Sequence, residues 1–291
     1  MVKNLTAENQ SLETKVTLAR AGNQQALEVV VRAVQKDVYG IALRFLWHPQ
    51  DAEDATQEIL IKVITNLGGF RGESGFKTWV YRIASNTLLT LKKKMMEEKA
   101  MTFDEFAEDL SQGVSGDPIR IECDLDEKLL LEEVKVGCTL AMLMCLDRKH
   151  RLAYILGEIV ELDHHEAAIV LEIAQATFRK QLSRARQRIL SVMTAKCGLV
   201  NPNNICRCRK RVDTAVFFGR IDPDNLLFAH SLSKAKHFPS ILDKIRQLED
   251  TRRISALYRS HSMPTPSEEF LFWLRKVIRE PKTTSLNSCQ E

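Results

Sequence analysis

The chain has 291 residues, of which 42 are lysine or arginine and 38 are aspartate or glutamate, so its formal net charge is +4. This length is sufficient for two or three domains with modest cores. No run approaches the roughly eighteen apolar residues of a membrane span, and residues 1–10 are too polar for a signal peptide. With an odd number of cysteines, seven, the composition predicts a cytoplasmic protein with reduced thiols.

The charges are segregated along the chain. Acidic residues far outnumber basic ones between Met95 and Glu133, whereas Asp213 is the single acidic residue between Gln175 and Arg220, a segment rich in arginine and lysine. Such segregation indicates a polyanion at one site and its avoidance or mimicry at another. It favours a partner such as nucleic acid for the basic segment.

Residues 1–98 are expected to form a first helical domain. Apolar residues at helical spacing predict a helix that stops at His48-Pro49, because proline disfavours helix in the preceding residue. A second helix is expected with Asp51 as its N-cap and with Gly68-Gly69 as its end. A third is expected from about Gly75-Phe76 into the basic turn at residues 92–94.

The second of these helices has two contrasting faces. One carries an apolar stripe at spacings of three and four, which predicts core: Ala52, Ala55, Ile59, Val63 and Leu67. The other is mainly acidic and includes an apolar residue, with Gln57 at its margin: Asp51, Asp54, Glu58, Ile61 and Thr65. An isoleucine in an acidic face suggests docking of a basic partner; an ordinary solvated face is the open alternative.

Residues 70–86 interleave aromatic, glycine and basic residues at the start of a helix. Aromatic rings can stack on bases while arginine and lysine follow phosphates. Trp79 and Ile83 also fit a buried helical stripe, so core packing is the expectation for these two side chains. The preceding loop, with Phe70 and Arg71 among glycines, is harder to explain as packing and favours nucleic-acid contact.

Residues 99–127 form an acidic stretch with no sustained period and are expected to be a linker. Residues 128–195 then predict a second small domain of four helices: Leu129–Leu146, Arg151–Val160, Asp163–Leu171 and Thr177–Met193. The last two are expected to form a helix-turn-helix, with Asp163 capping the first and Leu171–Ala176 as the connection. His164 and His165 are expected to face solvent.

The final helix of that domain separates apolar from basic residues. Phe178, Leu182, Ala185 and Ile189 form a narrow buried stripe. The residues left outside are long and mostly basic, which suits a major groove: Arg179, Lys180, Ser183, Arg184, Gln187 and Arg188. A basic surface helix without DNA contact is the plainer alternative.

Cysteines are unevenly distributed. Cys138 and Cys145 lie in an apolar helix and are expected to be small core residues. Cys197, Cys206 and Cys208 lie within twelve residues among basic neighbours, so they are candidate ligands for zinc or another metal, without an identified fourth ligand. One alternative is a redox switch in which nearby cations favour the thiolates. The other alternative is that these cysteines neither bind a metal nor act as a redox switch.

Two ordered motifs carry a family resemblance. Asp51–Glu58 followed by Phe70–Asn86 resembles region 2 of sigma-70 family factors of the extracytoplasmic-function group, and Asp163–Leu190 resembles their region 4. The resemblance covers residues 10–195. Glu172, Ala174 and Ala176 depart from it, because they stand where the family often has glycine, proline and glycine.

The resemblance implies an all-α protein that binds core RNA polymerase and promoter DNA, with an anti-sigma protein as a further candidate partner, and that is not an enzyme. Residues 1–98 would dock polymerase and open the −10 element, and residues 128–195 would read the −35 element. The implied polymerase-binding residues are Asp51, Asp54, Gln57, Glu58 and Ile61. The implied DNA-binding residues are Phe70, Arg71, Lys77, Trp79, Asn86, Gln175, Thr177, Arg179, Lys180, Ser183 and Arg184.

Residues 196–291 lie outside this two-region plan and form a C-terminal extension. Helices are expected over Pro239–Leu257 and Pro266–Ile278. We expect the extension to fold back on the two domains and to modulate promoter engagement; a small cap whose aromatic residues bury one another is the alternative. Two other functions remain open: a helix-turn-helix regulator that acts without polymerase, and a metal or redox sensor that gates DNA binding.

Overall fold

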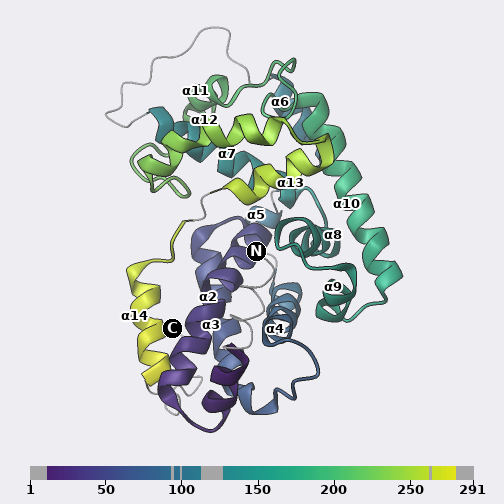
Figure 1. The fold of residues 1–291 in the computed structure, drawn as a ribbon. Helices are drawn as coiled ribbons and strands as arrows, with labels where there is room; N and C mark the ends of the chain where they lie inside the picture. The colour runs from purple at the N-terminus through teal and green to yellow at the C-terminus, as the bar shows by residue number, and fades with distance from the viewer. Residues whose placement is uncertain (1–11, 93–94, 99, 113–126, 262–263, 280–291) are drawn as a thin grey trace.

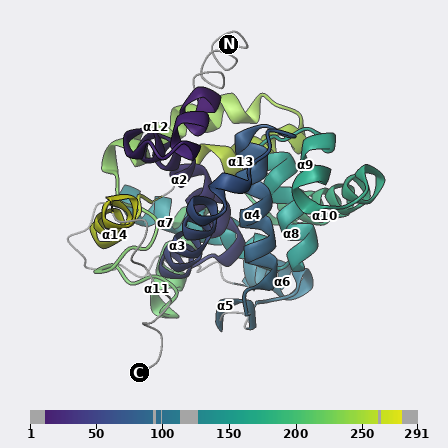
Figure 2. The ribbon, with the colours of Figure 1, turned by 90° about the horizontal axis from the view of Figure 1, so that it is seen from below.

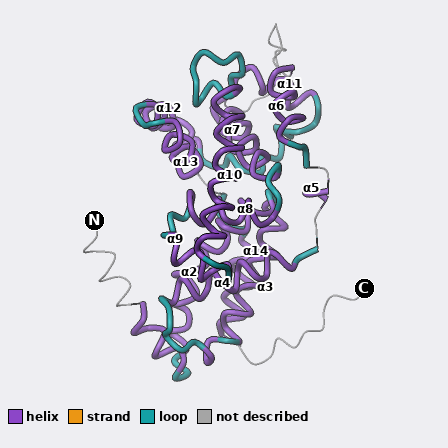
Figure 3. The backbone as a smooth tube through the Cα atoms, turned by 90° about the vertical axis from the view of Figure 1, so that its right-hand side faces the viewer, coloured by secondary structure: helices purple, strands orange, loops and turns teal. Residues whose placement is uncertain are grey.

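The computed structural model describes residues 12–92, 95–98, 100–112, 127–261 and 264–279. Every regular secondary-structure element in these ranges is a helix, and Figure 3 shows helices joined by loops throughout. The expected all-α fold is confirmed. No helix in the described part of the chain is both long enough and apolar enough to cross a membrane.

The N-terminal helical body contains α2 (Gln24–Leu46), α3 (Pro49–Thr65) and α4 (Phe76–Thr90), preceded by a helical segment over residues 12–20. The predicted N-cap of α3, Asp51, is wrong. The helix begins two residues earlier, with Pro49 at its first turn and the His48 ring accepting the Gln50 N–H at 3.3 Å. Proline suits that position because the N–H it lacks would have no helical partner.

The expected linker is partly helical. It contains α6 (Phe103–Gln112) and follows α5 (Met95–Glu98), the last helix of the expected first domain, whereas residues 113–126 lie outside the described residues. In α6 the side chains of Phe106 and Leu110 are buried, four residues apart on one face. A short helix among so many acidic residues gives too few apolar positions for a period to be recognised.

The second helical body contains α7 (Glu127–Met144), α8 (Arg148–Tyr154), η2 (Ile155–Ile159), α9 (His164–Leu171) and α10 (Gln175–Lys196). The expected helix-turn-helix is therefore present as α9 and α10. Figure 1 shows α10 running along one side of the molecule from the α9 turn to the level of α12 and α13.

The C-terminal extension contains α11 (Cys208–Phe217), α12 (Leu232–Arg246), α13 (Asp250–Ser260) and α14 (Glu268–Arg279). The prediction of a single helix over Pro239–Leu257 is wrong, because Pro239 lies inside α12 and that helix ends at Arg246. Arg253 stabilises this helix end: its guanidinium donates to the carbonyls of Arg246 at 3.0 Å and Leu248 at 2.9 Å. These bonds satisfy carbonyls that the end of α12 leaves open.

The extension folds back on both bodies, as expected. Tyr258 of α13 donates its hydroxyl to the Thr139 carbonyl of α7 at 3.1 Å. Farther on, α14 lies against α2 and α3 (Figures 1 and 2), and its Phe270 and Leu274 join the main core. The alternative of mutually buried aromatic residues is wrong in part, because Phe217, Phe218 and Phe272 are 73%, 63% and 67% exposed.

Candidate nucleic-acid interface

The outer face of α3 carries the predicted docking residues. Asp54 and Glu58 are exposed, and Glu58 accepts a hydrogen bond from Lys62 at 2.6 Å. Three others are partly buried: Asp51, Gln57 and Ile61. Ile61 is thus less accessible than the two carboxylates beside it, and its role in docking stays a prediction.

Glu53, which the sequence offered no reason to single out, lies on a neighbouring face of α3 and is only 7% exposed. The Ser267 N–H donates to one of its carboxylate oxygens at 2.6 Å, and the Ser267 hydroxyl donates to the other at 2.7 Å. The first turn of α14 is thus fixed beside the candidate docking face, at its Gln57 margin. Local sequence could not indicate this partner, because it lies 214 positions away.

The two candidate DNA-binding residues of the loop before α4 differ in exposure. Arg71 is exposed, whereas the Phe70 ring is 4% exposed and packs against Phe76 and Trp79, with ring centroids 5.5 and 5.4 Å apart. Gly72 has φ 74°, a left-handed conformation that favours glycine. Trp79 is buried, as its position in a helical stripe predicts; in this structure neither ring is available to stack on a base.

Lys77 lies on α4 and forms an ion pair with Asp37 of α2 at 2.9 Å. Tyr81 donates its hydroxyl to the same carboxylate oxygen at 2.9 Å. The lysine is only partly buried, so a phosphate can compete with Asp37 for its ammonium group.

The helix-turn-helix follows its expected design at the first helix. The Asp163 carboxylate accepts hydrogen bonds from the N–H groups of His165 at 2.8 Å and Glu166 at 2.9 Å, which confirms it as the N-cap of α9. His164 and His165 are exposed, as predicted. The turn contains Glu172 with φ 53° and ψ 41°, a left-handed conformation that a glycine would adopt without strain.

Along α10 the sequence pattern translates directly into burial. Phe178, Leu182, Ala185 and Ile189 are at most 2% exposed. The candidate DNA-binding residues of this helix all lie on the exposed side: Gln175, Thr177, Arg179, Lys180, Ser183 and Arg184. This one-sided distribution leaves an uninterrupted polar and basic surface on a helix whose other side is fixed in the core.

The two candidate DNA-binding regions are in contact. Asn86 of α4 donates from its side-chain amide to the Glu172 carboxylate in the helix-turn-helix at 2.9 Å. Both side chains are exposed, so this bond is an accessible link between the two helical bodies.

Comparison with known proteins agrees with these motifs. The sequence profile of Sigma-70 region 2 matches residues 30–95. RNA polymerase sigma-H factor of Pseudomonas aeruginosa is 30% identical over 177 residues, which cover 60% of this chain and 89% of that protein. ECF RNA polymerase sigma-E factor of Escherichia coli is 30% identical over 176 residues, covering 60% and 90%.

The chain belongs to the extracytoplasmic-function sigma factors. It is therefore a transcription initiation factor rather than an enzyme. Among solved structures, CnrH in complex with the cytosolic domain of CnrY aligns with a TM-score of 0.43 at 20% identity, over 62% of this chain and 95% of that one. The sigma factor RpoE in complex with the anti-sigma factor NepR from Bartonella quintana aligns with a TM-score of 0.39 at 21% identity, over 57% and 96%.

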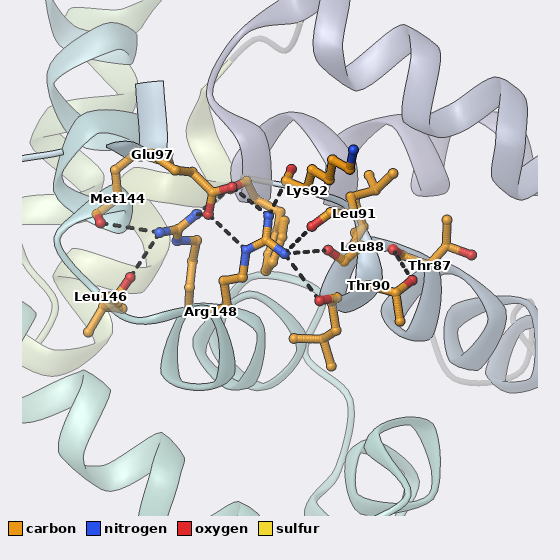
Figure 4. A network of polar contacts seen from close by, with 12 residues as sticks. Thr87, Leu88, Thr90, Leu91, Lys92, Glu97, Met144, Leu146 and Arg148 are labelled. Carbon is orange, nitrogen blue, oxygen red and sulfur yellow. Dashed lines mark hydrogen bonds and ion pairs between the residues drawn. The ribbon is translucent and has the colours of Figure 1, made fainter. Parts of the chain in front are cut away.

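A buried ionic network connects the two helical bodies of this sigma factor (Figure 4). Its centre is the Glu97 carboxylate of α5, whose side chain is 4% exposed and pairs with Arg148 at 2.6 Å and Arg151 at 2.9 Å. Arg148 also donates to the carbonyls of Leu89 at 3.1 Å and Leu91 at 2.6 Å, at the end of α4. The short helix α5, at the end of the expected first domain, thus supplies the ion that joins α4 to α8.

Arg151 extends this network into the core. Its guanidinium donates to the Phe45 carbonyl of α2 at 2.7 Å and to carbonyls at the end of α7, among them Leu143 at 3.0 Å and Leu146 at 2.9 Å. Burial by itself would raise the pKa of Glu97, but the hydrogen bonds and charges of the two arginines outweigh it and lower that pKa below its usual value. The carboxylate is therefore ionised at neutral pH and holds both cations in place.

The cysteines of the extension are shielded thiols: Cys206 is buried, and Cys197 and Cys208 are half-buried. Burial raises the pKa of Cys206 to about 11 and that of Cys208 to about 12, and it also raises the pKa of Cys197. Nearby arginine and lysine side chains lower these values only in part. Burial thus outweighs the nearby cations at these three thiols, and the metal or redox role expected from the sequence stays a prediction.

Proposed function

We propose that this sigma factor binds core RNA polymerase through the outer face of α3, opens the −10 element with the 70–77 loop and α4, and reads the −35 element with α10. The observation that carries the proposal is the division of α10 into a buried apolar stripe and an exposed basic side within a helix-turn-helix. A surface of this kind is suited to the major groove, because the helix is fixed while its long side chains remain free to reach base edges.

The outer face of α3 supports the polymerase-docking step. Asp54 and Glu58 present two exposed carboxylates one helical turn apart, with Ile61 beside them. Carboxylates around an apolar residue fit a basic partner surface, where charges set orientation and association rate while the apolar contact adds affinity.

Opening of the −10 element is the step that needs a conformational change. Asn86 is engaged by Glu172 of the helix-turn-helix, so promoter DNA reaches this amide only when α4 and α9 separate. This exposed hydrogen bond is worth about 1 kcal/mol or less, but separation of the two bodies must also overcome the packing of α4 on α9 and the buried network of Glu97 with Arg148 and Arg151 described above. We therefore propose that docking on polymerase moves the two helical bodies apart.

DNA reading by α10 is tested by quantitative footprinting of the polymerase complex on a preferred promoter and on variants of its −35 element. Arg179→Ala and Arg184→Ala should each weaken binding to the preferred sequence by about 1–3 kcal/mol. Lys180→Ala is the matched comparison on the same helix: as a phosphate contact it should weaken all sequences alike and reduce the salt dependence. An unchanged sequence preference in the doubly substituted Arg179 and Arg184 protein rejects the assignment.

Polymerase docking is tested separately with Asp54→Lys combined with Glu58→Lys. The double reversal should reduce affinity for core polymerase and abolish run-off transcription, while helicity stays unchanged because both side chains are exposed. Glu28→Lys on the partly exposed surface of α2 is the control and should leave affinity unaltered. Equal affinities for both proteins contradict the proposed docking face.

A further inference from the structure

Four cysteines that lie far apart in the sequence surround one small cavity. Cys138 comes from α7, Cys197 caps the C-terminus of α10, Cys206 lies in the loop that follows, and Cys208 begins α11. The cavity has a volume of about 80 Å³, which suits an ion better than an organic ligand. Cys138, expected from sequence to be only a core residue, is thus the fourth thiol that the pattern of the extension lacked.

The backbone fixes two of the four cysteines side by side. Cys197 and Cys206 face each other across an isolated parallel β-bridge, in which the Gly198 N–H donates to the Cys206 carbonyl at 3.1 Å.

The charges around the cavity are compatible with an anionic cluster. Its lining includes Lys135, Arg207, Arg211 and Arg246, and no carboxylate occurs among the described residues that line it. Three of these cations pair with carboxylates outside the lining: Lys135 with Glu132, Arg211 with Asp109 and Arg246 with Asp243. A divalent ion bound by four thiolates has a net charge of −2, which these cations would tolerate better than a ring of carboxylates would.

The apolar core beneath α11 is small, and ion pairs of Arg211 and Arg220 with Asp109 supplement it. The core cluster beneath α11 consists of Leu130, Val134 and Val212, and Ile205 in the loop is 73% exposed. Small elements with so little buried apolar surface commonly depend on a metal or a disulfide for stability. A bound ion would tie α7, the end of α10 and the start of α11 together at one point.

We propose that Cys138, Cys197, Cys206 and Cys208 bind one structural zinc ion and thereby anchor the C-terminal extension to the second helical body. Thiolates are soft ligands that select zinc over magnesium or calcium, and a closed set of four gives a structural rather than a catalytic site. Binding replaces four S–H protons by one Zn²⁺ and releases these protons to solvent. As the side chains stand, no three histidine, cysteine, aspartate or glutamate side chains in the described ranges are grouped to hold a metal ion, so the thiols must rotate toward the cavity.

The test is elemental analysis of the full-length protein, purified under reducing conditions and freed of loose metal with a weak chelator. The wild type should retain about one zinc per chain, and Cys138→Ser should retain almost none. Cys145→Ser is the matched control, since Cys145 lies two turns farther along the same segment, outside the lining of the cavity, and donates to the Ala141 carbonyl at 3.7 Å. It should keep the full zinc content.

A second measurement separates loss of the ligand from loss of the fold. Cobalt(II) added to the zinc-free wild type should give the intense visible bands of a tetrahedral tetrathiolate site, and Cys138→Ser should shift and weaken these bands at unchanged helicity. Three results overturn the proposal: a wild type without zinc that shows no cobalt bands, full zinc retention in Cys138→Ser, or a Cys197–Cys206 disulfide found by mass spectrometry in the freshly purified protein.

Discussion

The Glu97–Arg151 pair provides the most direct test of how the two helical bodies are held together. Replacing Arg151 by methionine keeps much of the side-chain volume but removes the guanidinium. Glu97 then loses one of its two cations, and the carbonyl groups of Phe45, Leu143 and Leu146 lose a donor, all in a site where Arg151 itself is 3% exposed.

The expected cost is large because the pair is buried. Removing one partner of a buried ion pair costs about 3–5 kcal/mol, since the other charge and its neighbours remain without compensation. Arg32→Met is the control: its pair with Glu28 lies on the surface, with both side chains about half exposed, and is worth less than about 1 kcal/mol.

The assay is urea unfolding of both full-length variants at neutral pH, followed by circular dichroism and tryptophan fluorescence. Arg151→Met should lower the free energy of unfolding by several times the loss in Arg32→Met. The two signals should also separate, because the helical bodies would no longer unfold together. Equal losses in the two variants would refute the view that this network joins the bodies.

Three further predictions concern the carboxylates of Glu97, Glu172 and Glu53. The lowered pKa of Glu97 contributes stability that is present above the usual glutamate pKa and is lost as the pH falls through the lower folded value. The free energy of unfolding should therefore decrease below about pH 4.5, and Glu97→Gln should lack this decrease. Glu172→Gly should stabilise the protein by about 1 kcal/mol in urea unfolding, because relief of the left-handed backbone exceeds the loss of an exposed bond to Asn86; a destabilised variant would contradict this. Glu53→Ala should speed hydrogen exchange in α14, since Ser267 at its start loses both acceptors, and unchanged exchange would show that apolar contacts alone hold the helix.

Periodic apolar spacing predicted most of this fold. It located the buried stripes of α3 and α10 and hence the faces that project toward solvent, because burial in a helix depends mainly on residues three and four positions apart. It also identified Asp163 as a cap, since the acceptor and the N–H groups it satisfies are adjacent in sequence. Sequence patterns predict structure well where the interacting groups lie within a few residues of each other.

The buried carboxylates could not be predicted in this way. Glu53, Glu97 and Glu133 resemble the surface acids around them, yet each is buried by partners distant in the chain. For Glu133 these partners are the N–H groups of residues 227–229, at 2.8–2.9 Å, and burial raises its pKa despite these bonds. Cys138 is similar: its apolar context indicates packing against the core, where it is half-buried, but only the fold brings it to the other thiols.

The contact of α14 with α2 and α3 has a consequence for protein synthesis. Glu53 precedes Ser267 by 214 residues, and Gln24 precedes Arg279, whose carbonyl accepts its side-chain amide at 2.6 Å, by 255. At about 5–20 residues per second, roughly 10–40 s of translation separate Glu53 from its partner. During that time the nascent N-terminal body lacks the apolar contacts of Phe270 and Leu274 and the two hydrogen bonds to the Glu53 carboxylate, so only a chain translated through α14 makes these contacts.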